Sequence, residues 1–388
     1  MDFDLTADQR LFRSTTREFL EKEMPLTRVR ELAEAGVGFE SDWWRRGSEL
    51  GWNSMTVAPE AGGDSISGEG LVDTCIVAEE MGRLISPGPL LGVNVVAAAL
   101  SEAANADEYA EVIAALMAGE AVASWAVYEP KRGFTPLAPQ VRAERDSAGY
   151  MLTGVKNRVD GGDQADWFLV TAAGPDGLAQ FLVPAGAPGV TVTAESSLDL
   201  VRHYARVELD GVVAPDGGMG GGGDGGMGGA GLVRPAGPAE AAVNRQVQIA
   251  AALQCAETAG AVQRVFEFTV QWAFDRYSFG RPLASYQALK HRFADMKTWL
   301  EACLATAGTA AHAASLRTED ADELASVAKS YVGQRATDII QDCVQLHGGI
   351  GVTWEHDIHL YLRRATVNRA MFGTPGEHRR RLADILGV

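Results

Sequence analysis

Cysteine is scarce in this sequence, and its few copies are scattered. The four cysteines stand at positions 75, 255, 303 and 343, with no Cys-x-x-Cys pair and no Cys/His group among them. Zinc sites and disulfide frameworks depend on such spacings, so neither is indicated. We expect no bound metal, and we expect the thiols to be small core residues.

Long hydrophobic runs are also missing. No apolar run reaches the about 18 to 20 residues needed to span a bilayer. The N-terminal stretch, MDFDLTADQRLFRSTTREFL, begins acidic and then turns amphipathic, whereas a cleavable signal peptide is basic and then apolar. We therefore expect a cytoplasmic protein with no membrane span.

Positive charge is outnumbered: 34 Lys and Arg against 51 Asp and Glu give a net charge of −17. Nucleic-acid affinity depends on clustered Lys and Arg, so we expect no nucleic-acid partner. Any anionic ligand must be bound by a local basic patch. The length of 388 residues allows two or three domains, because single cores rarely exceed about 250 to 300 residues.

The secondary-structure pattern changes twice along the chain. Residues 1–120 have apolar residues at spacings of three and four, as in TCIVAEEMGRLI, which predicts an N-terminal helical domain. Residues 121–215 have short β-rich runs such as WFLVTAA, which predict a central β domain. Residues 238–388 are helical again, and this order predicts an α+β multi-domain fold rather than a doubly wound sheet. The long periodic segments of this last part are at about 239–276, 285–315, 320–347 and 357–370.

A glycine-rich tract, DGGMGGGGDGGMGGAG, lies between the β domain and the last helical part. Glycines can cradle a phosphate, but here no strand leads directly into a glycine loop and then a helix. Pro235 and Pro238 also intervene before the next helix. We interpret residues 216–237 as a mobile interdomain linker.

Two segments of the C-terminal part have more polar residues than a helix connection requires. They are DRYSFGRPLASYQALKH, residues 275–291, and QLHGGIGVTWEHDIHLYLRRA, residues 345–365. Alone, the first arginine would be a surface charge near a helix C-terminus, and the glycine pair would be a helix cap. Together they offer a cation, an aromatic ring, two amides and a flexible turn: Arg276, Phe279, Gln287, Gln345, Gly348 and Gly349.

In residue type, order and placement these segments resemble the acyl-CoA dehydrogenase family. Their patterns are Arg-x-x-Phe-Gly-x-Pro-Leu-x-x-x-Gln and, near the C-terminus, Gln-x-His-Gly-Gly-x-Gly. The resemblance implies that family's fold, with N-terminal helices, a β-barrel-like middle domain and a C-terminal helical bundle. It also implies FAD as cofactor, α,β-desaturation of an acyl-CoA thioester, an electron-transfer flavoprotein as electron acceptor, and a homo- or hetero-tetramer.

The resemblance assigns the polar residues of these two segments to the ADP half of FAD, which in the family reaches into the adjacent subunit. A pyrophosphate needs a cation and backbone N–H donors, which Arg276 and a turn at Gly348 and Gly349 can supply. Gln287 and Gln345 add neutral donors and acceptors. Phe279, which precedes the Gly-x-Pro of the first pattern, adds a flat apolar surface.

The segments that hold the flavin ring in the family are altered. The family's Thr-Glu-Pro and Ala-Gly-Ser-Asp motif appears as YEPKRGF, beginning at Tyr128, so the Thr and Ser hydroxyls are absent. In GVKNRVDGG, Arg158 stands where a stacking aromatic ring is expected and Asp160 where a Thr hydroxyl is expected. An Asp near a reduced flavin opposes hydride acceptance unless Arg158 or a proton compensates. Arg158 and Asp160 could instead be exposed loop residues. Thr374, in the segment MFGT, is the threonine that the family has at this place, and the resemblance assigns it to the cofactor site.

The catalytic base is also hard to place. The family's Tyr-Glu-Gly-Thr segment is MFGT here, with Phe372 before the glycine, and the other usual position falls at Ala250. Nearby, Asn244 rather than Glu precedes Arg245. Glu257 lies two turns beyond Ala250, roughly 10 Å along the axis, on a similar face. Burial could raise its pKa and make it a base, or it could be a hydrogen-bonded structural residue.

Three interpretations follow from the resemblance. We favour a subunit of a hetero-oligomer that completes a partner's FAD site, as in the actinobacterial steroid side-chain acyl-CoA dehydrogenases, which are α2β2 assemblies with divided sites. The alternatives are a self-sufficient homomeric enzyme with Glu257 as base, and a non-enzymatic structural subunit. No residue identifies the acyl group.

Overall fold

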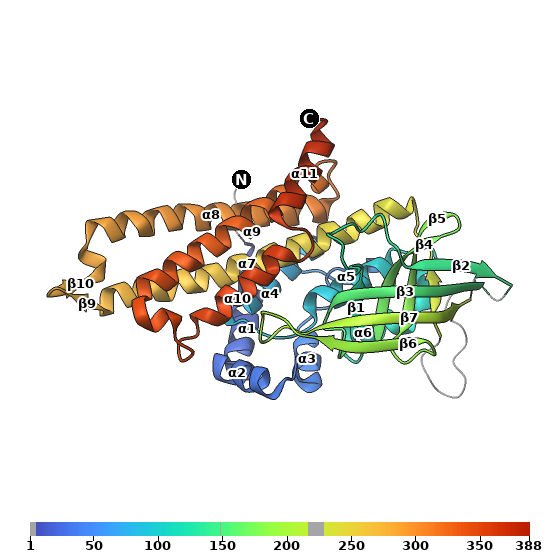
Figure 1. Cartoon of the computed structure of the whole chain (residues 1–388), viewed down its shortest axis with the longest axis horizontal. Helices are drawn as coiled ribbons and strands as arrows, with labels where there is room; N and C mark the ends of the chain where they lie inside the picture. Colours follow the sequence, from blue (N-terminus) through green and yellow to red (C-terminus); the bar gives the residue numbers. More distant parts are fainter. Residues whose placement is uncertain (1–4, 148, 216–228) are drawn as a thin grey trace.

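The N-terminal part is helical in the computed structural model, which describes residues 5–147, 149–215 and 229–388 (Figure 1). Thr6 begins the first helix because its hydroxyl accepts a hydrogen bond from the Gln9 N–H, in a reciprocal capping box. Gly119 ends the last helix at a φ of 69°. The helices are α1 Ala7–Glu23, α2 Leu26–Ala35, α3 Ser41–Ser48, α4 Gly70–Leu84, α5 Leu90–Ser101 and α6 Ala110–Ala118, with short 3₁₀ turns at Pro59–Ala61 and Ala106–Tyr109.

The middle part is an eight-stranded, mainly antiparallel sheet. Its strands are β1 Ala123–Ala126, β2 Arg142–Asp146, β3 Gly149–Asp160, β4 Trp167–Gly174, β5 Gly177–Pro184, β6 Val190–Glu195, β7 Tyr204–Ala214 and β8 Gly231–Val233. The order is β6-β7-β3-β2-β4-β5-β8, with β1 added in parallel beside β4. Within the described residues, β6 and β8 are the two ends of this order and do not pair with each other.

The glycine-rich tract is only partly described. Residues 216–228, most of the expected linker, lie outside the described residues. Its last part is not a linker, because Gly231–Val233 forms β8 and pairs with β5. The Leu232 carbonyl accepts hydrogen bonds from Asn105 Nδ2 at 3.0 Å and from Tyr109 Oη at 2.8 Å. These bonds fix this end of the sheet to the N-terminal helices.

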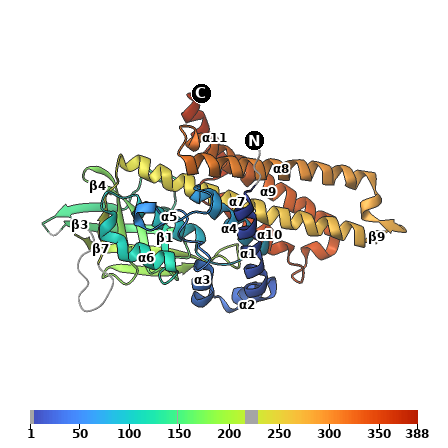
Figure 2. The ribbon, with the colours of Figure 1, turned by 180° about the vertical axis from the view of Figure 1, so that it is seen from behind.

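The C-terminal part is a helical bundle with a long arm. Its elements are α7 Ala239–Asp275, β9 Tyr277–Ser278, β10 Arg281–Pro282, α8 Gln287–Leu316, α9 Ala321–His347, α10 Ile358–Ala370 and α11 Pro375–Leu386, with 3₁₀ turns at Leu283–Ser285 and Gly348–Val352. Two views, turned by 180°, show the β9–β10 hairpin at the end of the molecule opposite the sheet (Figure 1, Figure 2). We call this hairpin, the ends of α7, α8 and α9 beside it and the turn after α9 the arm. The predicted family fold is confirmed.

Close helix packing at the centre depends on glycine. A Cβ at Gly82 of α4 would lie 1.9 Å from the Glu257 carbonyl oxygen of α7, and a Cβ at Gly260 of α7 would lie 2.0 Å from the Glu79 carbonyl oxygen of α4. The two helices therefore touch backbone to backbone. The four cysteines are buried and unpaired, as expected. No described helix is long and apolar enough to cross a membrane.

Candidate functional site

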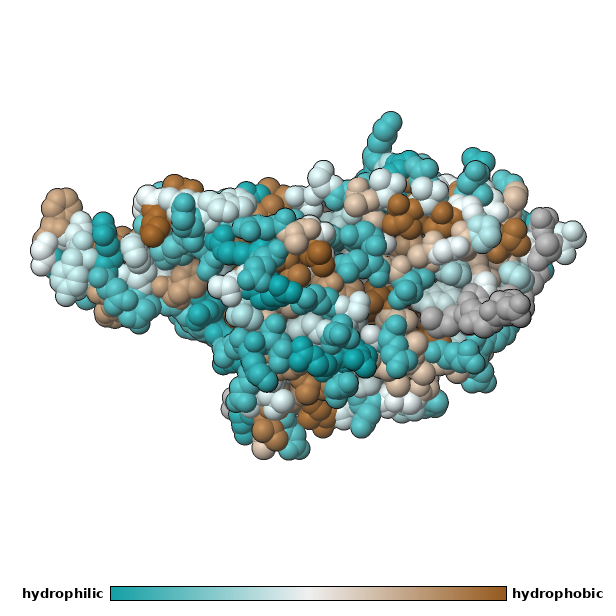
Figure 3. All heavy atoms as spheres, turned by 90° about the horizontal axis from the view of Figure 1, so that it is seen from below, coloured by the Kyte–Doolittle hydropathy of each residue, from teal (hydrophilic) through white to brown (hydrophobic). Residues whose placement is uncertain are grey.

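The residues assigned to the ADP half of FAD come from two stretches of the arm: the β9–β10 hairpin with the helix ends beside it, and the C-terminal end of α9 with the turn that follows. We call Arg276, Phe279, Gln287, Gln345, Gly348 and Gly349 the nucleotide half-site. All are exposed, and Phe279 is 97% exposed. Figure 3 shows that the tip stands clear of the rest of the molecule. Other exposed apolar side chains gather on the same hairpin and turn, a pattern typical of an interface: Phe274, Tyr277, Ile350, Val352 and Trp354.

The hairpin itself is a strained, well-supported turn. Phe279 and Gly280 connect β9 to β10, with φ values of 50° and 80°. Positive φ at both positions is the geometry of a tight two-residue hairpin, and it is unfavourable for a phenylalanine. The Tyr286 hydroxyl donates to the Ser278 carbonyl at 2.7 Å, and the Arg281 guanidinium lies 3.9 Å from the Tyr286 ring centre. The turn thus presents Phe279 outward at a fixed place.

Aromatic side chains from the altered flavin-ring motifs pack against one another. Trp125 and Phe372 stack with ring centres 6.1 Å apart, and Tyr128 lies 5.3 Å from Phe134 and 6.1 Å from Phe372. We call these four residues the aromatic cluster. Trp125, Tyr128 and Phe372 are at most 4% exposed. Three of them replace, in sequence, the hydroxyl and acidic groups of the family motifs, and they pack against one another.

Arg158 belongs to this cluster rather than to an exposed loop. Its guanidinium carbon lies 4.1 Å from the Tyr128 ring centre, and its Nη2 donates to the Arg132 carbonyl at 2.9 Å. Its backbone has a φ of 49°, and its N–H donates to Glu195 Oε2 at 2.7 Å. The position expected to stack on a flavin thus stacks on a tyrosine of the same chain.

Thr374 is occupied as a helix cap. It begins α11, and its hydroxyl accepts a hydrogen bond from the Glu377 N–H at 3.2 Å. Glu377 Oε2 accepts from the Thr374 N–H at 2.8 Å, and Glu377 Oε1 accepts from the Phe134 N–H at 3.0 Å. The Glu377 carboxylate therefore accepts hydrogen bonds from two backbone N–H groups beside the aromatic cluster. A carboxylate and packed rings therefore stand where the resemblance expects the contacts of a flavin ring.

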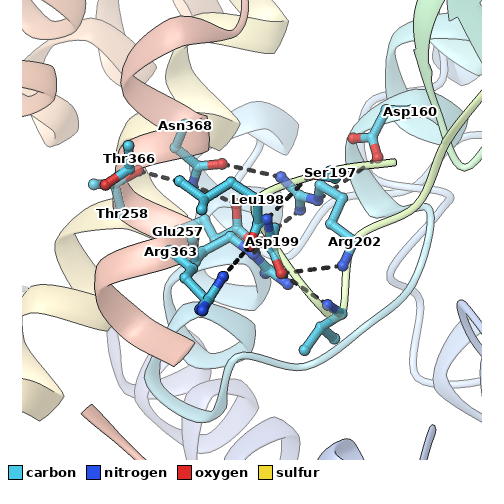
Figure 4. A network of polar contacts seen from close by, with 12 residues as sticks. Asp160, Ser197, Leu198, Asp199, Arg202, Glu257, Thr258, Arg363, Thr366 and Asn368 are labelled. Atoms are coloured by element: carbon cyan, nitrogen blue, oxygen red, sulfur yellow. Dashed lines mark hydrogen bonds and ion pairs between the residues drawn. The ribbon is translucent and has the colours of Figure 1, made fainter. Parts of the chain in front are cut away.

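Glu257 lies in a buried ion network (Figure 4). Its Oε1 accepts hydrogen bonds from Arg364 Nη1 at 2.7 Å and from Arg202 Nη2 at 2.8 Å. Its Oε2 accepts from Asn368 Nδ2 at 2.9 Å. Asp199 pairs with Arg364, whose side chain is 0% exposed. We call Asp160, Asp199, Arg202, Glu257, Arg364 and Asn368 the ion network.

Of the two interpretations of Glu257, the one that requires a raised pKa is not supported. Burial acts to raise this pKa, but Arg202 and then Arg364 lower it further than burial raises it, so the pKa lies below its ordinary value. Both carboxylate oxygens are already hydrogen-bonded. The arrangement therefore favours the ionised carboxylate and the interpretation of Glu257 as a hydrogen-bonded structural residue.

Asp160 is also part of the network and is not an exposed loop residue. Its carboxylate lies 3.6 Å from Arg202 Nε, and its side chain is 14% exposed. Burial raises the pKa of Asp160 above its ordinary value, and Arg202 opposes that rise. The network thus joins the end of β3 to the bundle helices α7 and α10.

Sequence reasoning missed most of the network. Asp199 and Arg202 come from the β6–β7 connection, while Arg364 and Asn368 come from α10. No spacing rule connects residues on separate elements more than a hundred positions apart. The only available signal was the composition of the segment LRRA, which places an arginine inside an otherwise packed helix.

A buried histidine holds the loop that carries Phe372. His378 is 2% exposed, and its Nε2 bonds the Phe372 carbonyl at 2.8 Å. Burial, and then the nearby Lys329 ammonium, lower the pKa of His378 from 6.5 to about 4. The folded chain therefore keeps this imidazole neutral at pH values where the unfolded chain protonates it.

Acid should consequently destabilise the chain through His378. The free energy of unfolding should fall, by on the order of 3 kcal/mol, as pH drops from about 6.5 to about 4, because only the unfolded state binds the proton. Denaturant unfolding across this range measures the slope. His378→Gln should flatten it, and His291→Gln, at an exposed histidine of α8, should leave it unchanged. Equal slopes in His378→Gln and the parent would contradict the assignment.

Comparison with known proteins places all three parts in one family. Models of the acyl-CoA dehydrogenase N-terminal, middle and C-terminal domains match residues 6–120, 124–208 and 241–387. Acyl-CoA dehydrogenase IpdE2 of Mycobacterium tuberculosis is 29% identical over 97% of this chain and 96% of its own length.

Solved structures agree. A Tcur3481-Tcur3483 steroid ACAD variant is 25% identical, with a TM-score of 0.85 over 98% of this chain and 97% of that one. A chain of the ChsE4-ChsE5 complex from Mycobacterium tuberculosis is also 25% identical, with a TM-score of 0.85 over 100% of this chain and 99% of that one. These similarities cover the nucleotide half-site, the aromatic cluster and the ion network alike.

Proposed function

Because this chain belongs to the acyl-CoA dehydrogenase family, a family of FAD-dependent oxidoreductases that act on CH–CH bonds, we propose that it is one subunit of a hetero-oligomeric enzyme and completes the FAD site of a related subunit. One observation carries the proposal. The residues that the resemblance assigns to the nucleotide are present and exposed on the arm, while the residues at the altered flavin-ring motifs pack against one another as the aromatic cluster. Such an asymmetry is what a divided site requires.

The arm's contribution is binding and orientation. Arg276 offers a guanidinium to a pyrophosphate, and the turn at Gly348 and Gly349 offers backbone N–H groups. A Cβ at either glycine would meet nothing within 4 Å, so a ligand can approach the backbone closely. Phe279 adds apolar cover at the hairpin tip. The chemistry that bound FAD supplies is acceptance of a hydride from the substrate.

Proton abstraction has to come from the other subunit. Phe372 stands at the family's acidic position and is buried in the aromatic cluster. Glu257, the remaining candidate, is held ionised by Arg202 and Arg364. A general base works best when its pKa lies near the working pH. Glu257, with a pKa lowered below its ordinary value, does not meet that requirement, which disfavours the self-sufficient homomer.

The relatives support a hetero-oligomer and a bulky substrate. One similar structure is a complex of two differently named chains, ChsE4 and ChsE5, and another is named a steroid ACAD. We accordingly propose an acyl-CoA thioester of the steroid side-chain type as substrate. An electron-transfer flavoprotein is the acceptor we propose from the family resemblance.

Reconstitution tests this function. The chain and a related acyl-CoA dehydrogenase subunit that carries the glutamate missing at Phe372 are purified separately and then mixed. Dehydrogenation of a steroid side-chain acyl-CoA, followed with an artificial electron acceptor, should appear only in the mixture. Activity of this chain alone would instead support the homomer. Full activity of the partner alone would instead support the interpretation of this chain as a non-enzymatic structural subunit.

A further inference from the structure

Trp272 of α7 connects the two segments of the nucleotide half-site. Its indole stacks on the His347 ring with centres 5.3 Å apart and planes 19° apart. Its Nε1 donates to the Leu346 carbonyl at 3.3 Å. One helical turn further along α7, the Arg276 guanidinium carbon lies 5.9 Å from the Trp272 ring centre. A single side chain thus contacts both the arginine and the residues that precede the glycine turn.

His347 is enclosed on several sides. It is 5% exposed, and its Nδ1 lies 2.9 Å from the Cys343 carbonyl, so that nitrogen carries the hydrogen. Phe268 of α7 lies edge-on at 5.7 Å and His356 at 4.6 Å. Burial lowers the pKa of His347 below its ordinary value. Its ring therefore has one fixed orientation.

These contacts also change the electrostatics at the end of α9. The last carbonyls of a helix carry partial negative charge and have no intrahelical donor. A pyrophosphate beside such an end would be repelled. Here His347 Nδ1 donates to the Cys343 carbonyl, and Trp272 Nε1 donates to the Leu346 carbonyl. The Leu346 carbonyl, one of these last four, is therefore capped by a neutral indole, and the Cys343 carbonyl, one turn earlier, accepts a second side-chain donor.

The glycine turn is anchored at one end and open at the other. A Cβ at Gly351 would lie 2.6 Å from the Val344 carbonyl oxygen and 2.9 Å from the His347 Cβ. Gly348 and Gly349 have open space where a Cβ would point. The packed end therefore fixes the turn against His347, and the open end faces a ligand.

We propose that Trp272 and His347 are positioning residues that set Arg276 and the Gly348–Gly349 turn at the spacing a bound ADP moiety requires. This inference rests on the proposed function of the arm. Neither side chain needs to touch the cofactor. They raise nucleotide affinity because a site held in its binding geometry loses less conformational entropy on binding.

The test measures FAD affinity in the assembled complex. The complex is deflavinated and titrated with FAD, and binding is followed by flavin fluorescence. Trp272→Leu removes the stack, the N–H donor and the cation–π contact, and should weaken FAD binding about tenfold. Trp272→Phe keeps the ring and should recover most of this loss. The flavin reduction potential should stay unchanged, because the flavin ring lies in the partner.

Trp299 of α8 provides a matched control. It is half-buried and lies between two arginines, with Arg292 at 5.2 Å and Arg335 at 4.9 Å from its ring centre. Trp299→Leu should leave FAD affinity unchanged. Equal FAD affinities for Trp272→Leu and Trp299→Leu would overturn the inference.

Further outcomes separate this inference from the proposed function. If Arg276→Ala weakens FAD binding and Trp272→Leu does not, only the positioning role fails. If neither change affects binding, the proposed function fails as well. A shifted flavin potential in Trp272→Leu would also overturn the positioning role. Should that variant not assemble, His347→Gln is expected to weaken binding about fivefold by loss of the stack, and unchanged affinity would contradict the inference.

Discussion

Glu257→Gln should lower the free energy of unfolding by about 3 to 5 kcal/mol, because it leaves two buried guanidiniums without a shared counter-charge. Arg202 and Arg364 are 9% and 0% exposed, and both bond the same carboxylate oxygen. Turnover per folded complex should stay the same. Denaturant unfolding of the chain, together with steady-state assays of the assembled complex, measures both effects.

Glu267→Gln is the matched control for this change. Glu267 lies on the same helix and pairs with Arg83 at 2.6 Å, but its side chain is 38% exposed. Its loss should cost no more than about 1 kcal/mol, because solvent screens the pair. Removal of a general base lowers rates by about 10² to 10⁴. Unchanged stability together with such a rate loss in Glu257→Gln would make this residue the base.

Arg276→Ala should reduce flavin retention in the assembled complex by about tenfold or more, since a charge-assisted contact is worth about 1.5 to 3 kcal/mol. The measurement is the FAD remaining per complex after dilution and gel filtration. Lys297→Ala is the control, at a lysine further along α8 that is 52% exposed and pairs with Glu301, and it should leave flavin retention unchanged. Flavin occupancy in Arg276→Ala equal to that of the parent would refute the assignment of the arm tip.

Long periodic segments made the helical parts of this fold predictable. The sequence predicted a helix at about 239–276, and α7 spans Ala239–Asp275. Pro238 fixes its start because proline has no N–H to donate, and a helix's first turn needs none. β8 was missed because a three-residue strand after a glycine tract has no detectable alternation. The order of the strands in the sheet could not be predicted, because strand pairing is a long-range property.

The candidate site was predictable only where it is contiguous in sequence. Arg276 and the glycine pair sit in short motifs, so their type and order were enough to bring them together. The pKa of Glu257 depends on Arg202 and Arg364, which lie 55 and 107 positions away. Burial alone predicts the wrong direction for such a group. Its charge partners, invisible in sequence, decide the sign.

The aromatic cluster shows a similar limit. The sequence showed that Thr and Ser hydroxyls and an acid are absent, but it did not show how the larger side chains at those positions pack. In the structure, Tyr128 and Phe372 are buried against each other, and Arg158 covers Tyr128. The residues that replace the family's polar groups at separate places in the sequence pack against one another in the structure. That coupling follows from tertiary contacts between β1, β3 and the segment before α11.

The most direct test of the divided-site account is the FAD content of the chain purified without a partner, compared with that of the assembled complex. The account predicts a colourless chain with no dehydrogenase activity, and one FAD for each pair of unlike chains in the complex. The contrary result is a yellow homomer that desaturates an acyl-CoA and loses that activity on Glu257→Gln.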